Sequence, residues 1–421
     1  MTRETGVLVV GGGATGAGVA RDLALRGVDV TLAERGSLSA GTSGRSHGLL
    51  HSGARYAEAD ARGAEECIAE NRVLRDVAGA CVRDTGGLFV SLDDDDPGYF
   101  DRKVAACREA GIPAEVLDPA TARELVPDLA SSVERVCRVP DAVVYPSRLV
   151  AANAADAEAR GAAVLTDAPV EDLHVADGTV TGATLGGAVD ERVDAEYVVN
   201  ATGAWAGRLA ALAGVEVAMR PTRGVMAAVD YPGLGPVLNR CREAADGDIV
   251  VPHDGQAVLG TTSVVVDDPD GYETPDWEVD RVFDECAEML PAVADLAVER
   301  AWWGVRPLYA PDEDSRGTVD GGVGEARGIS RGFFLLDHAA DGADRFASVV
   351  GGKLTTYRRM AAATADLVCE ALDVDTPCRT GEERLPGADD PAELDRLVER
   401  YGGAAPTDAD VVGAEARASG D

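Results

Sequence analysis

Three glycine-rich loops in this chain have the spacing that brings backbone N–H groups against a phosphate-bearing ligand. The first is Gly11-Gly-Gly13-Ala-Thr-Gly16, which lies between an apolar run and a helical pattern. Its first glycine allows a tight turn, the second lets backbone approach a pyrophosphate, and the third lets the helix pack on the strand. Glu34 follows at the end of the next apolar run, where a carboxylate can bind both hydroxyls of a ribose. We therefore predict a dinucleotide site that includes these residues and the neighbouring Arg35.

Two later loops favour FAD over NAD. Ala201-Thr-Gly203 directly follows a strand-like run, the arrangement by which flavoprotein folds bring a second strand end against the adenosine half of the cofactor. A third loop ends the apolar run at 346–350 and begins a helix, so its N–H groups would face an electron-rich ligand such as a flavin carbonyl. That loop contains Gly351, Gly352, Lys353, Leu354 and Thr355. Three such loops in this order predict bound FAD.

The elements that must position these loops form an α/β domain. Residues 6–10 and 28–33 are short β-branched runs typical of buried parallel strands, and 14–26 has helical periodicity. Residues 217–265 alternate like an antiparallel sheet, and helices are expected over 61–82, 99–111, 147–160, 279–290 and 353–372. We predict a discontinuous, doubly wound FAD-binding domain at 1–60, 140–216 and 326–375. A sheet-rich substrate or cap region would comprise 61–139 and 217–325, and 376–421 would be an acidic C-terminal tail.

The charge balance restricts the class of partner. The chain of 421 residues has 74 acidic and 39 basic residues, a formal net charge of −35. Such a field repels nucleic acid, so we expect no nucleic-acid partner. Lys103 and Lys353 are the only lysines, and the other basic residues are arginines. Dense carboxylate with almost no lysine indicates a halophilic protein, because concentrated salt screens the self-repulsion.

Other classes are disfavoured by what the sequence lacks. The eight cysteines form no C-x-x-C pair and have no iron–sulfur or zinc spacing, so we expect reduced thiols and no metal. No run of about 18 apolar residues suggests a transmembrane helix, and no basic-then-apolar segment suggests a signal peptide. We expect a cytoplasmic protein.

The segment at 42–56, T-S-G-R-S-H-G-L-L-H-S-G-A-R-Y, resembles the flavin and substrate loop of FAD-dependent glycerol-3-phosphate dehydrogenases. Its form is most similar to the catalytic A-type chain of the anaerobic enzyme, of the haloarchaeal type. The resemblance implies a glutathione-reductase-like FAD domain of the D-amino-acid-oxidase superfamily. Further matches follow in family order over residues 6 to about 388, among them V-P-D at 139–141, G-T-T-S at 260–263, G-V-R-P-L at 304–308, S-R-G at 330–332 and G-G-K-L-T-T-Y-R at 351–358.

The resemblance implies oxidation of sn-glycerol 3-phosphate to dihydroxyacetone phosphate, with the C2 hydride passing to flavin. Electrons would continue to a quinone or to partner subunits. The A-type chains of the anaerobic enzymes usually continue into a cysteine-rich iron–sulfur domain that this chain does not reach. We therefore expect either a truncated chain or direct transfer from flavin. Any membrane contact would be peripheral, on the inner face of the cell membrane, through partners.

The resemblance also implies roles for individual residues. At the cofactor it places Thr42, Ser43, His47 and Gly48, and at the substrate it places Arg55, Tyr56, Thr262, Arg306, Arg331 and Lys353. Arginine suits a phosphate because its planar fork donates in pairs, and a lysine near the flavin carbonyl would stabilise negative charge. We take His51, Arg306 and Lys353 as the catalytic residues. His47, His253 and His338 remain candidates for the base.

Two other functions remain open at this stage. A related FAD-dependent amino-acid or 2-hydroxy-acid oxidoreductase would bind a carboxylate, usually with one arginine, whereas several cations favour phosphate. A flavin-bearing assembly protein without turnover is the other alternative, and reduction of the flavin by substrate would exclude it.

Overall fold

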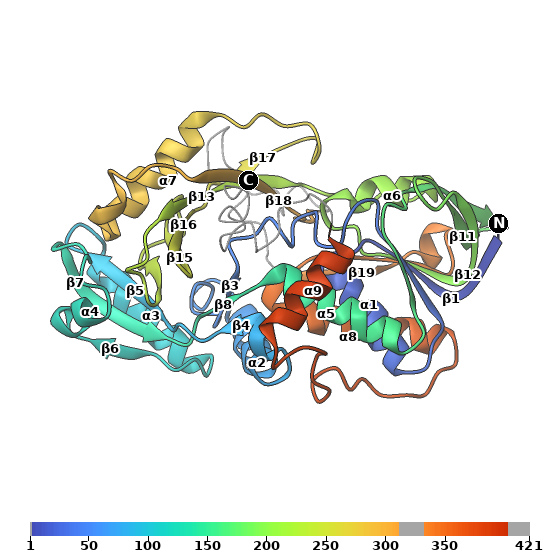
Figure 1. Cartoon of the computed structure of the whole chain (residues 1–421), viewed down its shortest axis with the longest axis horizontal. Coiled ribbons are helices and arrows are strands. Elements are labelled where there is room, and N and C mark those ends of the chain that lie inside the picture. The colour runs from blue at the N-terminus through green and yellow to red at the C-terminus, as the bar shows by residue number, and fades with distance from the viewer. Residues whose placement is uncertain (1, 311–331, 403–421) are drawn as a thin grey trace.

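A computed structural model describes residues 2–310 and 332–402 of the chain. Two large sheets occupy opposite ends of the long axis, and a small three-stranded sheet lies between them (Figure 1). The N-terminal strand belongs to the sheet at one end, and the strands from 222–265 belong to the sheet at the other. Each sheet has its own apolar core, as expected for two structural units.

The first sheet has a parallel centre. Strand β1 (Thr2–Val10) pairs with β2 (Val30–Ala33) on one side and with β12 (Glu191–Asn200) on the other. Parallel strands β9 (Ala163–Leu165) and β20 (Phe346–Gly351) extend this centre. Antiparallel strands β10 (Val170–Ala176), β11 (Thr179–Leu185) and β19 (Phe333–Asp337) complete the sheet. The β-branched run at 7–10 is buried, as the sequence predicted for a strand covered on both faces.

Helices cover both faces of this sheet. α1 (Ala14–Leu25), α5 (Pro146–Ala159) and α8 (Tyr357–Ala371) pack together on one face, where Leu23 and Leu149 are fully buried. The short helix α6 (Ala206–Leu212) packs on the other face, in the same apolar core as residues of β10 and β11 at the sheet edge. The doubly wound α/β arrangement predicted from the glycine loops is therefore confirmed.

The second sheet is antiparallel except for one pair. Its order is β17 (Val264–Val265), β13 (Thr222–Asp230), β16 (Gln256–Gly260), β15 (Ile249–His253), β14 (Val237–Arg240), β5 (Gly87–Leu92), β7 (Val133–Val139) and β6 (Glu115–Leu117). β18 (Arg300–Arg306) pairs along β13, and only β14 and β5 run parallel among these described strands. Helices α7 (Asp276–Met289) and α4 (Pro119–Leu125) cover one face, and α3 (Pro97–Glu109) packs near β5 and β7.

The small sheet joins the two units. It consists of β3 (Leu49–Leu50), β8 (Ala142–Val144) and β4 (Val82–Arg83). Leu49 and Val143 pack against residues of the antiparallel sheet, whereas Leu50 and Val144 face the core under α1. Helix α2 (Ala61–Val77) buries Leu74 and Val77 in that same core, so it packs against the FAD side although its residues fall in the expected cap region.

The chain beyond residue 376 differs from the expected tail. Helix α9 (Pro391–Tyr401) packs on α5, and Leu394, Leu397 and Tyr401 are buried there. Asp390 caps its first turn through the N–H groups of Ala392 and Glu393. The polar composition hid this helix, because its apolar residues recur at helical spacing on one face only. Residues 403–421 lie outside the described part.

Candidate active site

A cavity of about 700 Å³ lies between the two sheets, and all three glycine loops line it. Each loop contributes residues to the lining: Gly11 and Gly13 in the first, Ala201 and Gly203 in the second, and Gly352, Lys353 and Leu354 in the third. These loops follow the carboxyl ends of β1, β12 and β20, the edge at which open parallel sheets bind ligands. The prediction that distant loops share one site therefore agrees with the structure.

The first loop leaves no room for side chains. Gly11 has φ of +111°, and a Cβ there would lie 2.5 Å from the carbonyl oxygen of Ala201. A Cβ on Gly16 would lie 1.8 Å from the oxygen of Gly11, so Gly16 serves helix packing and does not line the cavity. The N-terminus of α1 thus opens into the cavity with the positive end of its dipole.

Glu34 and Arg35, which the motif predicts at the adenosine half of the cofactor, are each fixed by neighbouring groups. The two carboxylate oxygens of Glu34 accept from the backbone N–H groups of Gly12, at 2.6 Å, and Gly36, at 3.0 Å. The guanidinium carbon of Arg35 lies 4.2 Å from the centre of the Trp205 ring, and Arg35 pairs with Asp270 at 2.9 Å. Both Glu34 and Arg35 line the cavity.

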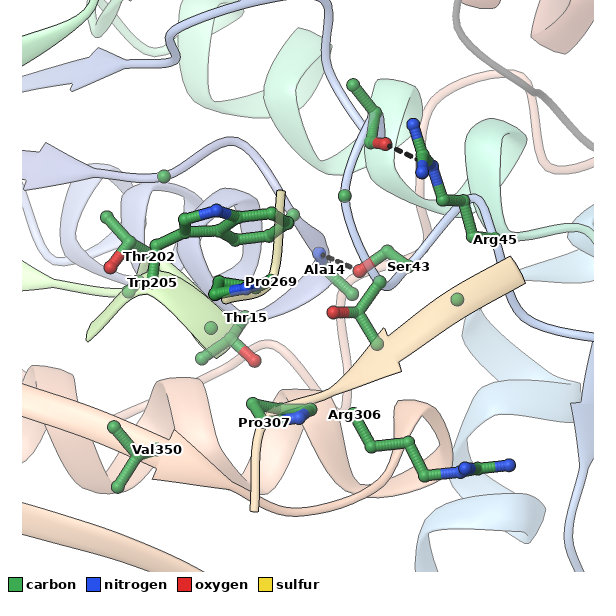
Figure 2. Close-up of a pocket in the computed structure, with 18 of the residues that line it drawn as sticks. Ala14, Thr15, Ser43, Arg45, Thr202, Trp205, Pro269, Arg306, Pro307 and Val350 are labelled. Carbon is green, nitrogen blue, oxygen red and sulfur yellow. Dashed lines mark hydrogen bonds between the residues drawn. The ribbon is translucent and has the colours of Figure 1, made fainter. Parts of the chain in front are cut away.

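The loop at 42–47 is fixed against the glycine loop and against β18. The Ser43 hydroxyl accepts from the N–H of Ala14 at 3.0 Å, and the Thr42 hydroxyl donates to the Val305 oxygen at 2.6 Å. Arg45 donates to the Ala40 oxygen at 3.2 Å. Figure 2 shows Trp205 on one side of the cavity and Arg306 extending from the end of β18 on another.

His51, Tyr56 and Lys353 form a contact cluster at the cavity. The His51 and Tyr56 rings pack edge to face with centroids 5.3 Å apart, and the Lys353 ammonium lies 4.5 Å from the Tyr56 ring centre. His47 is next to them, with its ring centroid 6.2 Å from that of His51. All four line the cavity, and so does Arg306.

The backbone around His51 is held from three elements. Its N–H donates to the Thr355 hydroxyl at 3.0 Å, and its carbonyl accepts from the Asn71 amide at 3.2 Å. The next N–H, of Ser52, donates to the buried Asp141 carboxylate at 2.7 Å. Burial raises the pKa of Asp141, although hydrogen bonds from Ser52 and Asn239 oppose that shift. Thr355 therefore orients the His51 loop and does not line the cavity.

Some expected residues lie elsewhere. Arg55 pairs with the fully buried Asp248 at 3.2 Å and does not line the cavity. The Thr262 hydroxyl donates to Glu278 at 3.0 Å, away from the cavity, because the β-branched side chain of Thr262 is packed inside the sheet. Gly48 sits against Val144 and His253 and does not line the cavity either. Arg331 lies outside the described residues.

Two candidate bases are also removed from the cavity. His253 is buried and bonds the His47 oxygen at 2.9 Å through Nε2, and burial lowers its pKa to about 4. His338 is buried between Asp341 and Ser348. Of the histidines named from the sequence, His47 and His51 reach the cavity.

Several cavity residues were not singled out from the sequence. Arg45 lies inside the recognised segment, and Trp205 directly follows the second glycine loop, so proximity to a motif could have indicated both. Arg208 on α6 and Asp270 after β17 also line the cavity and pair with each other at 2.6 Å. No motif indicated them, because they come from separate elements that meet only after folding.

The described residues fit a dinucleotide. The glycine loops, the N-terminus of α1, Glu34, His51 and Lys353 all line the same cavity. Within that part of the chain, no group of three or more His, Cys, Asp or Glu residues could hold a metal ion. No helix in residues 2–310 and 332–402 is long and apolar enough to cross a membrane.

Comparisons with known proteins agree with this geometry. The family model of FAD-dependent oxidoreductases matches residues 6–358. The chain is 49% identical over 416 residues to the A1 subunit of the anaerobic glycerol-3-phosphate dehydrogenase of Haloferax volcanii, covering 96% of this chain and 70% of that protein. It is 42% identical over 399 residues to the corresponding A-type chain of the Escherichia coli K12 enzyme, covering 93% and 72%.

Solved structures give the same fold. The glycerol-3-phosphate dehydrogenase of Bacillus halodurans, complexed with FAD, is 25% identical with a TM-score of 0.69, covering 94% of this chain and 71% of that one. Glycine oxidase of Geobacillus kaustophilus, 22% identical with a TM-score of 0.69 over 91% of this chain and 98% of that one, shares the fold. The predictions of fold and of FAD are confirmed. The chain belongs to the family of FAD-dependent oxidoreductases, together with the A-type chains of anaerobic glycerol-3-phosphate dehydrogenases.

Proposed function

We propose that this chain oxidises sn-glycerol 3-phosphate to dihydroxyacetone phosphate. The observation that supports the proposal most is that His51, Tyr56, Lys353 and Arg306 all line one cavity, where Tyr56 contacts both His51 and Lys353. A substrate with one phosphate and one secondary alcohol needs cations for the first group and a proton acceptor for the second. The similarity to relatives named as glycerol-3-phosphate dehydrogenases points to the same substrate.

Arg306 and Lys353 provide the cations for the phosphate. Both line the cavity, and they come from different sheets, β18 and the loop after β20, so the phosphate would bridge the two units. A guanidinium and an ammonium at a partly enclosed site bind a dianion more strongly than in open water, because the local dielectric constant is lower.

His51 is the group that takes the proton from the C2 hydroxyl. Thr355 and Asn71 bind its backbone and Asp141 binds the next N–H, so the imidazole is presented from a well-anchored loop. FAD, when bound, accepts the hydride from C2. The Tyr56 ring contacts both His51 and Lys353.

Electrons would then leave to partner subunits and, through them, to a quinone. The support is that the relatives are named as single subunits of an anaerobic enzyme, which implies that other subunits accompany them. Association with the inner face of the cell membrane through such partners belongs to the same proposal.

An anaerobic titration of the FAD-loaded chain in molar KCl tests the proposal. Glycerol 3-phosphate should bleach the flavin absorbance near 450 nm, whereas glycerol, lactate and alanine should not. Arg306→Gln should require at least about tenfold more substrate for the same bleaching. Bleaching by an amino or hydroxy acid instead would contradict the phosphate assignment. A flavin that no candidate substrate reduces would favour a flavin-bearing assembly protein without turnover.

A further inference from the structure

A buried carboxylate lies behind Arg306. Glu278 is on α7, on the outer face of the antiparallel sheet, and its side chain is 0% exposed. Its Oε1 accepts from Nε and Nη2 of Arg223, at 2.9 and 2.6 Å. Its Oε2 accepts from the Thr262 hydroxyl at 3.0 Å and from the Trp303 indole at 2.9 Å. Four donors therefore fix one carboxylate that does not line the cavity.

Two of these partners, Arg223 and Thr262, also bind the guanidinium of Arg306 through their backbone carbonyl groups. Nη1 of Arg306 donates to the Arg223 carbonyl oxygen at 3.4 Å, and Nη2 donates to the Thr262 carbonyl oxygen at 3.0 Å. Nη2 also donates to the Thr261 hydroxyl at 3.0 Å. Glu278 thus binds the side chains of Arg223 and Thr262, and the carbonyl oxygens of the same two residues accept hydrogen bonds from Arg306.

Gly224 shows how closely the guanidinium lies against the sheet. A Cβ at this position would lie 2.6 Å from Nη2 of Arg306 and 2.4 Å from the Thr261 hydroxyl. The missing side chain leaves the space that Arg306 occupies. Arg306 is therefore held by acceptors on β13 and in the turn after β16, and two of the three belong to residues whose side chains bind Glu278.

We propose that Glu278 is a positioning residue that fixes Arg306 in the cavity through Arg223 and Thr262. This inference rests on the proposed function, in which Arg306 binds the substrate phosphate. Removal of the negative charge of Glu278 leaves the buried Arg223 guanidinium without a counter-charge. The side chains of Arg223 and Thr262 are then held less firmly, and so are the carbonyl groups of these two residues, which accept from Arg306. A displacement of the guanidinium of the order of 1 Å is enough to weaken a positioned contact substantially.

A double-mutant cycle on the FAD-loaded chain tests this coupling. The variants are Glu278→Gln, Arg306→Gln and the double substitution, and the readouts are flavin content, half-saturating glycerol 3-phosphate and the maximal bleaching rate. We expect Glu278→Gln to keep its flavin and to raise half-saturation about tenfold, with a smaller effect on the maximal rate. In the Arg306→Gln background the second substitution should change half-saturation by less than about twofold.

Glu285→Gln is the matched control. Glu285 is on the same helix, is 12% exposed and pairs with Arg242 and Arg281, so its loss has a comparable structural cost at a distance from Arg306. We expect its half-saturation to equal that of the unmodified chain. If Glu278→Gln does not fold, Thr262→Val replaces it in the cycle, because it removes one link between Glu278 and the Arg306 acceptors while keeping the side-chain volume.

The outcomes separate the inference from the proposed function. Independent effects of the two substitutions, or a Glu278→Gln variant that behaves like Glu285→Gln, would overturn the inference while leaving the function intact. An Arg306→Gln variant that saturates like the unmodified chain would overturn both the phosphate role of Arg306 and the positioning role of Glu278. Absence of bleaching by glycerol 3-phosphate in the unmodified chain would do the same.

Discussion

The ammonium group of Lys353 lies 4.5 Å from the centre of the Tyr56 ring, on the cavity side of the turn at 55–58. Lys103 contacts the same turn from the cap side, where Nζ donates to the Arg55 oxygen and pairs with Glu58, both at 3.3 Å. These are the only two lysines in the chain. Both sites hold a compact ammonium group, which is a point charge unlike the planar, forked guanidinium of the other basic residues.

Lysine-selective acylation should modify Lys353 and leave Lys103 unmodified. Lys353 lines the cavity, whereas Lys103 is 3% exposed and packed against Phe89 and Tyr99. Glycerol 3-phosphate should slow the modification of Lys353 by at least about fivefold, because a bound phosphate covers the amine. Peptide mass spectrometry separates the two sites from the N-terminal amine. Equal protection by lactate would argue against a phosphate site at Lys353.

Replacing Lys103 with methionine should destabilise the chain. The variant leaves the Glu58 carboxylate without this cation and the Arg55 carbonyl without this donor, at a cost of about 3 kcal/mol in the free energy of unfolding. Arg102→Met is the matched control, since Arg102 also pairs with Glu58 but its side chain is 60% exposed. That change should cost less than about 1 kcal/mol. Denaturant unfolding at constant KCl measures both, and similar losses would contradict a special role for Lys103.

Substitution of Gly11 by alanine should abolish FAD binding. The positive φ and the 2.5 Å approach to the Ala201 oxygen force the turn to move, and with it the N–H groups at the start of α1. Gly255→Ala provides the comparison, because a Cβ there meets nothing within 4 Å. The ratio of flavin to protein absorbance after purification is the measurement. Full flavin content in Gly11→Ala would rule out a close approach at this loop.

His253 should make the fold sensitive to mild acid. Burial lowers its pKa to about 4, so below about pH 6.5 the unfolded chain takes up a proton that the folded chain does not bind. Stability is therefore complete above pH 6.5 and is lost as the pH falls toward 4. Between pH 6.5 and 5 the loss should be about 2 kcal/mol.

The His253→Gln variant isolates this contribution from the carboxylates. Its amide can still donate to the His47 oxygen, but it has no proton to gain. Unfolding of both proteins at pH 7 and pH 5 gives the difference in slope. Parallel pH dependence of the two proteins would show that His253 does not titrate in this way.

The cofactor loops were predictable because their chemistry is local. A turn with φ of +111° at Gly11 needs glycine, a strand and a helix on either side, and those signals lie within one short stretch of sequence. The same holds for the segment from Thr42 to Tyr56, whose residue order carried the family resemblance. Helix α9 was missed because its composition is polar, and the sequence shows its buried face only as the helical spacing of a few apolar residues.

The roles of Arg55 and Thr262 were not predictable in this way. Arg55 is adjacent to Tyr56, which lines the cavity, and Thr262 lies in the G-T-T-S stretch that contributed to the family resemblance, so neither motif could show which way the side chain points. Asp248 and Glu278, which bind their side chains, come from different elements. A buried carboxylate binds the donors that surround it, and which donors these are is decided only when the elements that carry them pack together.

The sequence by itself determined the FAD fold, the three loops at the nucleotide and the family, because each depends on backbone conformations that few residues can adopt. The tertiary structure alone decided which cations face the cavity. Arg306 and Lys353 reach it while Arg55 does not, since the direction of a long side chain depends on the carboxylates and carbonyls that packing brings beside it.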